Sequence, residues 1–450
     1  MYEETDRQTG FLVFVHYINY QIKETASMLH YIDPGTGSML FTILVGLLSA
    51  GGYKFKDSLV KARFLLSGGN VRNDNKEHPD FVIFSDHKRY WNVFEPICDE
   101  FENRGQRLVY MTASSDDPAL KKDYKFVRSE FIGEGNKAFA RLNTMSADIV
   151  LSTTPSLDVL YWKRSKNVKY YVHIPHAASD LTMYRMFGID FYDAILTSGD
   201  YHEKQIRELE HIRGIPEKEI VKTGLTFMDS MKKRLDAAAP LSIGENKTVL
   251  LAPSWGASAI LSKYGTNIID ALLQTDYHII IRPHPQSYTS EKELIDMLIE
   301  KYPESDRLEW NKDNDNFDVL RKSDIMISDF SGVMFDFSLV FDKPLIYTDV
   351  QYDDSPYDAC WLNEEPWTFK VLPTLGEKLT YNNISNLGEV IERCLNDSIY
   401  EEGREAARKE TWSYMGESAE RIVDYLLDKH RQLQDTGVET KEETKPEPAA

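Results

Sequence analysis

The chain has 450 residues, of which 42% are hydrophobic, so it is long enough for two or three domains with cores of their own. The formal net charge of -20 at pH 7 argues against a nucleic-acid-binding protein, whose binding surface would be basic. Cys98, Cys360 and Cys394 are widely spaced without a metal-ligand pattern, which fits a reducing compartment and predicts no bound metal.

An uncharged stretch near the N-terminus predicts a single membrane anchor over residues 35–55, after an N-terminal extension over residues 1–34. The stretch reaches the length of about 20 residues that a spanning helix needs. Basic residues crowd its C-terminal side, so the positive-inside rule places the remaining chain on the cytoplasmic side of the cell membrane. The basic residues are Lys54, Lys56, Lys61 and Arg63.

Alternatives to a spanning anchor remain open. An interfacial amphipathic or hairpin anchor would use the same apolar residues. A cleaved signal peptide is disfavoured because the apolar run begins late and lacks a basic leader. Residues 11–20 are apolar but too short to span, and both Met1 and Met28 are candidate start residues.

Alternating strand and helix patterns predict a first α/β lobe over residues 75–235. The expected strands lie at residues 81–84, 107–111, 149–151, 170–172 and 194–197. His173 and His176 follow the fourth of these runs. His173 lies within the strand pattern, so a hydrogen-bonded core histidine is the simpler interpretation for it.

A linker over residues 236–247 leads to a second α/β lobe over residues 245–385. Its expected strands lie at residues 249–251, 278–281, 325–327 and 344–347. Residues 386–433 predict terminal helices, and residues 434–450 are polar and contain proline, which predicts a disordered tail.

The segment over residues 328–337 predicts a phosphate site in this second lobe. An apolar strand leads into Ser331 and Gly332, where backbone N–H groups can approach an anion at the start of a helix over residues 333–341. A plain N-cap explains Asp329 or Ser331 equally well.

Two more strand ends in this lobe carry polar residues. Arg282 and His284 follow the strand over residues 278–281, at the sheet edge where α/β proteins bind ligands. A structural histidine in a proline-locked loop is the alternative for His284. Ser254 and Trp255 follow the strand that begins the lobe.

The order of these motifs resembles the CDP-glycerol glycerophosphotransferase family, whose members prime and polymerise teichoic acids and related surface polymers. The family's motifs correspond here to His176-Ala177, residues 192–195, residues 223–226, residues 253–256, residues 282–285 and residues 329–332. Three positions depart from the family pattern: Ala177 replaces a glycine, Gly256 an arginine and Gly332 a serine. Arg282 could compensate for the missing arginine, and Gly332 still permits close approach to phosphate.

The resemblance implies two Rossmann-like lobes facing a cleft, the GT-B fold. It implies transfer of glycerol phosphate, or a related alcohol phosphate, from a CDP-alcohol to a hydroxyl of a lipid-linked or glycan acceptor, with release of CMP. His176 would be the general base, and His284 the second catalytic residue. The donor would contact Arg282, Ser254, Asp329, Ser331, Gly332 and Asp336, without a cofactor.

Several interpretations stay open beside this one. Asp329 and Asp336 could each hold a ribose hydroxyl or orient a histidine, or could be an N-cap and a solvated helix carboxylate. A GT-B glycosyltransferase or a nucleotide-sugar epimerase would share the strand-end histidine and the phosphate-binding turn. A catalytically inactive, membrane-bound binding protein is the alternative from another class.

Overall fold

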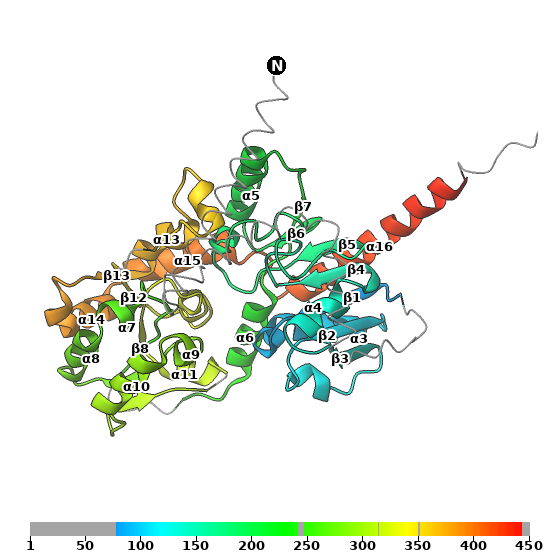
Figure 1. The fold of residues 1–450 in the computed structure, drawn as a ribbon. Coiled ribbons are helices and arrows are strands. Elements are labelled where there is room, and N and C mark those ends of the chain that lie inside the picture. The colour runs from blue at the N-terminus through cyan, green and yellow to red at the C-terminus, as the bar shows by residue number, and fades with distance from the viewer. Residues whose placement is uncertain (1–77, 242–246, 314, 350–351, 443–450) are drawn as a thin grey trace, which may run out of the picture.

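The computed structural model describes residues 78–241, 247–313, 315–349 and 352–442. Within these residues the chain forms two α/β lobes, each built on one sheet of parallel strands (Figure 1). The predicted extension over residues 1–34 and the predicted anchor over residues 35–55 lie outside them. No helix in the described part of the chain is both long and apolar enough to cross a membrane.

The N-terminal lobe contains a seven-stranded sheet in the order β3-β2-β1-β4-β5-β6-β7. Every residue of β1, β2 and β6 is buried, because helices and loops cover both faces of a parallel sheet. The strands are β1 (Phe81–Ser85), β2 (Leu108–Thr112), β3 (Val127–Phe131), β4 (Ser146–Ser152), β5 (Asn167–His173), β6 (Ala194–Thr197) and β7 (Glu219–Lys222).

The C-terminal lobe contains a six-stranded sheet in the order β10-β9-β8-β11-β12-β13. The strand order reverses between β8 and β11, which creates the kind of crevice where α/β sheets bind ligands. The strands are β8 (Thr248–Leu251), β9 (His278–Ile281), β10 (Leu308–Trp310), β11 (Ile325–Ser328), β12 (Leu345–Thr348) and β13 (Gly376–Leu379).

Short amphipathic helices connect the strands and supply the core on the sheet faces. In the N-terminal lobe they are η1 (Lys88–Tyr90), α3 (Trp91–Asn103), η2 (Pro118–Lys121), α4 (Asn136–Leu142), η3 (Leu181–Met183), α5 (Asp200–Arg213) and α6 (Thr226–Ala237). Helix α5 ends at Gly214, whose φ of 60° is the left-handed conformation that glycine adopts without steric cost.

The C-terminal lobe has more and shorter helices. They are α7 (Ile260–Lys263), α8 (Thr266–Leu273), α9 (Ser287–Ser290), α10 (Lys292–Lys301), α11 (Phe317–Lys322), α12 (Val333–Phe335), η5 (Asp358–Trp361), α13 (Trp367–Leu375), η6 (Ile384–Asn386), α14 (Leu387–Asn396) and α15 (Ile399–Thr411). Helix α12 continues directly as a π-helical segment, η4 (Asp336–Val340). The helix expected over residues 333–341 is therefore present with a change of winding.

The last helix, α16 (Ser418–Glu442), returns to the N-terminal lobe and packs against α3 and β4. Its Ile422, Val423 and Leu426 are fully or almost fully buried in the same core cluster as Phe101 of α3. Residues 434–442 were expected to belong to a disordered tail but form the end of α16, which projects from the body in Figure 1, and the rest of the expected tail lies outside the described residues.

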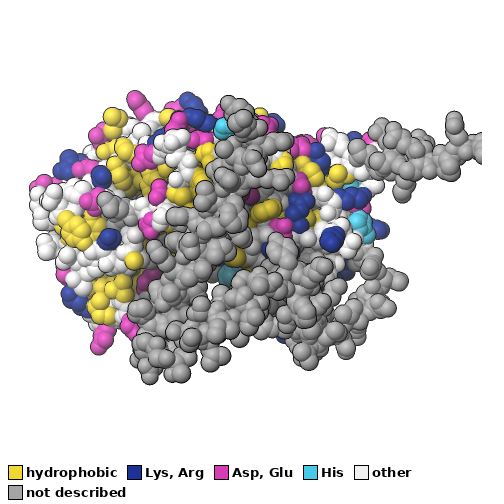
Figure 2. All heavy atoms as spheres, turned by 45° about the horizontal axis from the view of Figure 1, so that its top comes forward, with side chains coloured by type: hydrophobic (Ala, Val, Ile, Leu, Met, Phe, Trp, Pro, Cys, Tyr) yellow, Lys and Arg dark blue, Asp and Glu magenta, His cyan; other side chains and the backbone are white. Residues whose placement is uncertain are grey.

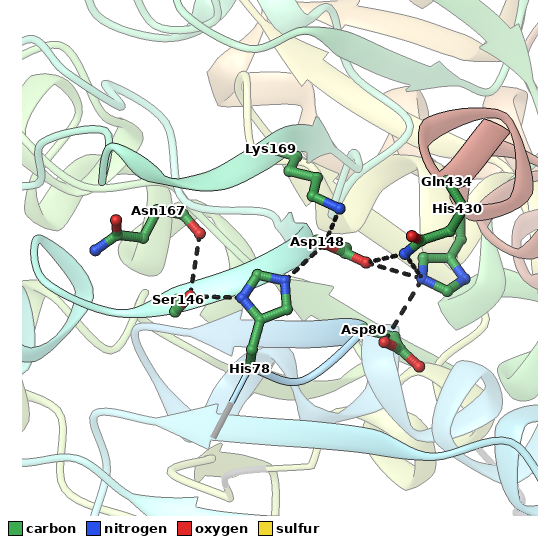
Figure 3. Close-up of polar contacts among 8 residues, drawn as sticks. All are labelled: His78, Asp80, Ser146, Asp148, Asn167, Lys169, His430 and Gln434. Carbon is green, nitrogen blue, oxygen red and sulfur yellow. Dashed lines mark hydrogen bonds and ion pairs between the residues drawn. The ribbon is translucent and has the colours of Figure 1, made fainter. Parts of the chain in front are cut away.

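A polar cluster around Asp148 fixes α16 to the N-terminal lobe, and we call it the Asp148 cluster (Figure 3). The Asp148 side chain is 1% exposed and interacts with Lys169 at 2.7 Å, His78 at 2.7 Å, His430 at 2.9 Å and Gln434 at 2.6 Å. Burial opposes ionisation of Asp148, but hydrogen bonds from Lys169, His78 and His430 outweigh it and lower its pKa. Its carboxylate is therefore charged and fully paired.

Two buried aspartates connect the lobes away from the linker. Asp358 accepts hydrogen bonds from the backbone of Phe187 at 2.8 Å and Gly188 at 3.1 Å, and pairs with Arg213 at 2.5 Å. Asp180 accepts from the backbone of Trp367 at 2.9 Å and Thr368 at 2.7 Å. These contacts hold the chain around α13 against the N-terminal lobe.

The described surface carries charges of both signs. On the face shown in Figure 2, basic and acidic side chains of the described residues are interspersed. Positive charge at a phosphate site must therefore come from a local arrangement of residues.

Candidate active site

A cavity of about 360 Å³ lies between the lobes, and we call it the central cavity. It is bordered by chain segments that follow β1, β5, β8, β9 and β11, at the carboxyl ends of these parallel strands. The predicted residues that line it are His176, Arg282, His284, Ser331, Gly332 and Asp336. The fold thus gathers six of the eight predicted site residues around one space.

His176 is half-buried on the N-terminal side of the central cavity. Its Nδ1 lies 2.9 Å from the hydroxyl of Thr153 and 3.2 Å from that of Tyr184. The rings of Tyr90 and Tyr184 flank the imidazole at centroid distances of 4.8 and 5.7 Å. Either hydroxyl oxygen can accept a hydrogen bond from Nδ1–H, and Nε2 has no hydrogen-bond partner among the described residues.

Burial, followed by the positive charge of Arg89, lowers the pKa of His176 to about 4. His176 is therefore neutral near pH 7. A neutral imidazole whose Nδ1 donates a proton presents an unprotonated Nε2, which is the form that a general base requires.

His284 lies on the C-terminal side of the same cavity, in the loop after β9. The backbone N–H of Gln286 donates to its Nδ1 at 3.1 Å, so the proton of the neutral ring is on Nε2. Burial, followed by the charges of Arg89 and Arg282, lowers its pKa to about 4. His284 is thus held as a hydrogen-bond donor, the opposite tautomer to the one open to His176.

Two arginines from different lobes line the central cavity. Arg282 follows β9, and its guanidinium donates to the side chain of Asn311. Arg89 belongs to η1 of the N-terminal lobe and has an exposed side chain that lies over the Tyr90 ring at 4.9 Å. No ion-pair partner of Arg89 occurs within the described residues, whereas its neighbour Lys88 pairs with Asp116.

The turn between β11 and α12 brings backbone N–H groups to the cavity. Ser331, Gly332 and Val333 all line it, and the first N–H groups of a helix have no intrahelical acceptor. A Cβ atom on Gly332 would lie 3.2 Å from the Cβ of Ala177 across the cavity. The family pattern has a serine at position 332 and a glycine at position 177. This chain has the smaller residue at 332 and the larger residue at 177, and the two positions face each other.

Asp336, at the start of η4, also lines the central cavity. Burial raises its pKa to about 7, against the opposing effect of a hydrogen bond with the Asn316 side chain. A hydrogen bond from Asp336 to a histidine is not found in the described structure. The carboxyl group is therefore available to a ligand and changes charge near neutral pH.

Asp329 and Ser254 do not line the central cavity. Asp329 is 2% exposed and accepts backbone hydrogen bonds from Ser254 at 2.9 Å, Ile260 at 3.0 Å and Phe330 at 2.7 Å. It neither orients a histidine nor caps α12, whose N-cap is Gly332. Its carboxylate instead holds the loop after β8 against the turn after β11.

His173 is fully buried at the end of β5 and lies outside the cavity lining. Its ring packs against Tyr192 and Tyr184 at centroid distances of 4.9 and 5.4 Å. Burial lowers its pKa to about 3. His173 is therefore a core residue, as its sequence pattern indicated, but the expected hydrogen bonds are missing, because neither ring nitrogen has a partner among the described residues.

Sequence reasoning missed three residues of the central cavity and its surroundings: Arg89, Thr153 and Tyr184. Arg89 belongs to a polar run directly after β1, and Thr153 directly follows β4. Both therefore carried the strand-end signal that identified Arg282 and His284. Tyr184 had no comparable signal, because it reaches His176 only through the loop after β5.

Ligand atoms of Asp80, Asp148 and His430 come close enough for a metal ion, the one such group among the described residues. The ammonium of Lys169 already occupies one Asp148 oxygen at 2.7 Å. The group also lies at the start of β1 and β4, the sheet edge opposite the central cavity. Its donors and charges fit a structural ion-pair cluster.

Comparisons with known proteins give a family and a fold. A comparison with curated protein sequences found no match. The family model described as CDP-Glycerol:Poly(glycerophosphate) glycerophosphotransferase matches residues 182–428, more than half of the chain. The match contains His284 and the turn after β11 and begins shortly after His176.

Among solved structures, the chain is similar to a variant of the wall teichoic acid polymerase TagF soaked with CDPG, at 16% identity and a TM-score of 0.54. That alignment covers 84% of this chain and 98% of the polymerase chain. UDP-GlcNAc 2-epimerases from Methanocaldococcus jannaschii and Neisseria meningitidis align at 15% and 14% identity, each with a TM-score of 0.51, over 77% of this chain and 99% of theirs.

At these identities the solved structures establish the two-lobed GT-B-like fold alone, which confirms the predicted architecture of the described residues. The family model shows more than the fold, because it is a match in sequence and includes most of the C-terminal lobe. The chain is a CDP-glycerol glycerophosphotransferase-like transferase and belongs to the CDP-glycerol:poly(glycerophosphate) glycerophosphotransferase family.

Proposed function

We propose that the protein transfers glycerol phosphate from CDP-glycerol to a hydroxyl group of a lipid-linked or glycan acceptor in cell-surface polymer synthesis. The acceptor oxygen attacks the phosphorus that carries glycerol and forms a new P–O bond. The bond from that phosphorus to the bridging diphosphate oxygen breaks, and CMP leaves with the electron pair. The proton of the attacking hydroxyl passes to His176.

His176 acts as the general base in this proposal. Its Nδ1 donates to the hydroxyl of Thr153 or Tyr184, which leaves the Nε2 lone pair for the acceptor hydroxyl. The low pKa keeps the ring neutral at pH 7. A hydroxyl becomes an effective nucleophile only as its proton is removed, so this position is where a base is needed.

The opposite side of the central cavity stabilises the leaving phosphate. His284 donates from Nε2, and Arg282 supplies positive charge beside it. The backbone N–H groups of Ser331, Gly332 and Val333, whose residues line the same space, would add further donors. Asp336 would contact a ribose hydroxyl of the donor, while Asp329 and Ser254 support the binding loop from behind.

One observation carries the proposal: His176 and His284 line one cavity from opposite lobes, and their contacts allow an unprotonated Nε2 on His176 while placing a proton on Nε2 of His284. The test is to incubate the purified protein with CDP-glycerol, other CDP-alcohols and UDP-N-acetylglucosamine, with and without acceptor extracts. We expect acceptor-dependent release of CMP from a CDP-alcohol. Release of UDP, or epimerisation of the sugar, without any CMP release would contradict the proposal.

We propose that residues 35–55 anchor the protein at the cytoplasmic face of the cell membrane. The support is the uncharged run followed by four basic residues. Membrane fractionation of the full chain and of a chain lacking residues 1–55 tests this. The full chain should remain with membranes through high-salt washing, and recovery of both chains in the soluble fraction would contradict an anchor.

A further inference from the structure

The two lobes are joined by a pair of short segments that run antiparallel to each other. One is residues 184–188 of the N-terminal lobe, which follow η3 and which we call the Tyr184 loop. The other is residues 354–361 of the C-terminal lobe, which contain η5 and which we call the η5 segment. The N–H of Asp358 donates to the carbonyl oxygen of Tyr184 at 3.0 Å. The other backbone contacts are an antiparallel bridge between Arg185 and Tyr357 and a hydrogen bond of 3.2 Å from the N–H of Met186 to the carbonyl oxygen of Pro356.

The side chain of Asp358 closes this junction. It is fully buried, and its two oxygens accept hydrogen bonds from the consecutive backbone N–H groups of Phe187 at 2.8 Å and Gly188 at 3.1 Å. Arg213 of α5 pairs with the same carboxylate and also with Asp190 at 2.6 Å, so the charge of Asp358 is compensated. One residue of the C-terminal lobe therefore holds the backbone of the Tyr184 loop.

The Tyr184 loop has a conformation that needs such support. Phe187 has a φ of 65°, in the left-handed region that a bulky side chain seldom adopts. A residue keeps this conformation only where its surroundings determine it. Here the surroundings are the hydrogen bond to Asp358 and the Arg213 guanidinium, 4.9 Å from the Phe187 ring centroid. At Gly188 the chain lies so close to Tyr184 that an added Cβ would be 2.7 Å from the Tyr184 Cβ, so a shift of this backbone would move Tyr184.

Tyr184 connects the loop to His176 in the central cavity. Its hydroxyl lies 3.2 Å from His176 Nδ1, and its ring stacks on the imidazole with an angle of 28° between the ring planes. Thr153 contacts the same nitrogen at 2.9 Å. The direction of the imidazole therefore depends on two hydroxyl groups, and the position of one of them is set by the loop that Asp358 holds.

We infer that Asp358 is a positioning residue, which orients the His176 ring from the opposite lobe by holding the Tyr184 loop. The lobe that carries His284 thereby also fixes the direction of the histidine across the cavity. The effect of Asp358 on turnover rests on the proposed function, because it requires His176 to act as the base. The orientation of the His176 ring does not depend on that function.

The first test observes the His176 ring by NMR in the full chain without nucleotide. Histidines are labelled with ¹³C at Cε1, and the His176 signal is the one that disappears in His176→Ala. Because the Tyr184 ring stacks on the imidazole, a change in their arrangement alters the chemical shift of this signal. Asp358→Asn should shift the His176 signal.

Asp148→Asn is the matched control, because it makes the same change to a buried, paired carboxylate at the opposite edge of the N-terminal sheet. It should move the signals of His78 and His430 and leave that of His176 in place.

The second test compares kinetic constants in the CMP-release assay. Asp358→Asn and Tyr184→Phe should each lower kcat about 3- to 10-fold, the effect of one lost hydrogen bond, with the KM for CDP-glycerol unchanged. The double variant should lose no more than the weaker of the two single variants, because both changes act through one contact. Asp148→Asn should keep the parent kcat.

Asp358→Asn leaves Arg213 paired with Asp190, so the fold should remain intact. If this variant does not fold, Arg213→Lys replaces it, since it keeps the buried charge but loses the guanidinium that contacts both carboxylates, and it should shift the same signal. An unmoved His176 signal, or losses of kcat that multiply in the double variant, would overturn the inference. If no donor gives CMP, the proposed function fails, and the NMR result still decides whether Asp358 orients His176.

Discussion

The Asp148 cluster and the central cavity lie at opposite edges of the N-terminal sheet and use similar residues in different ways. Around Asp148, one buried carboxylate contacts a lysine, two histidines and an amide, so its charge is fully compensated. Around the central cavity, two histidines and two arginines face a space where Asp336 supplies the one carboxylate lining it among the described residues.

This difference separates a stabilising cluster from a binding site. Paired charges hold elements together, as α16 and β4 are held by Asp148. At the central cavity, burial and then positive charge lower the pKa of both histidines, and Arg89 has no ion-pair partner among the described residues, which a bound diphosphate would supply. Mutations at the two places should therefore change different measured properties.

The largest effect is expected for His176→Ala. Loss of a general base should reduce the rate of transfer about 10²- to 10⁴-fold, while CDP-glycerol still binds through the other lobe. A CMP-release assay beside calorimetry with CDP-glycerol measures both properties. His211→Ala, on the exposed side of α5, is the control and should behave as the parent protein. Normal turnover in His176→Ala would remove His176 from the mechanism.

His284→Ala should reduce turnover about 10²- to 10³-fold and also weaken CDP-glycerol binding, because its proposed contact is the diphosphate itself. His278→Ala changes a histidine at the opposite end of the same strand and serves as the control. The same two assays apply. If binding is unchanged while only the rate falls, His284 acts on the transition state alone and not on the bound donor.

Asp148→Asn should destabilise the protein without changing the chemistry. Loss of the charge leaves Lys169 and two histidines without their shared partner, and the free energy of unfolding should fall by about 3 kcal/mol. Urea unfolding at pH 7 measures this. Asp116→Asn breaks an exposed pair with Lys88 and should change the free energy of unfolding much less than Asp148→Asn does.

The stabilisation by Asp148 also has a defined pH dependence. Because the folded protein holds the pKa of Asp148 below its ordinary value, its contribution is present above that ordinary value and is lost as the pH falls through the folded pKa. In Asp148→Asn, the free energy of unfolding should no longer include this loss at low pH. An unchanged acid unfolding midpoint would mean that the cluster does not control stability.

Arg89→Gln should weaken donor binding about 10-fold, the value of one charge-assisted contact. It should also move the pH profile. His176 acts as a base only above its pKa, so activity is lost as the pH falls through about 4. Removal of the Arg89 charge raises the pKa of His176 and of His284. The acid limb of kcat/KM should therefore shift to higher pH. Lys88→Gln, whose ammonium is paired with Asp116, should leave the limb in place.

The smallest effect is expected at Ala177 and Gly332, which face each other across the central cavity and reverse the residue sizes of the family pattern. Gly332→Ser introduces a Cβ only 3.2 Å from that of Ala177, and should raise the Kd for CDP-glycerol about 2- to 3-fold. The double variant Ala177→Gly with Gly332→Ser should return to the parent value. Calorimetry on the three proteins gives the coupling, and purely additive effects would show that the two positions are independent.

The sequence predicted the inner strands of both sheets and missed four of the thirteen strands that the described residues form. The four, β3, β7, β10 and β13, are the two edges of each sheet. Their sequences VRSEF, EIVK, LEW and GEKL each carry charge, as edge strands commonly do to avoid pairing with other chains. A search for apolar runs finds inner strands, because only those are buried on both faces.

The same reasoning explains which site residues could be predicted. Polar residues directly after apolar strands identified His284, Arg282 and Ser331, and the same rule applied after β1 would have found Arg89. Asp329 satisfies the rule and still points away from the central cavity, since its direction depends on backbone N–H groups of another loop. Spacing along one strand end cannot reveal such a tertiary contact.

The return of α16 to the N-terminal lobe affects the order in which the protein can fold. Domains usually fold as they leave the ribosome, N-terminal part first. The apolar surface of α3 is covered by three residues of α16, Ile422, Val423 and Leu426. The core of the N-terminal lobe therefore lacks these residues until the whole C-terminal lobe has been synthesised. We therefore expect that a protein divided at the linker needs residues 418–435 supplied in trans to complete the core of its N-terminal lobe.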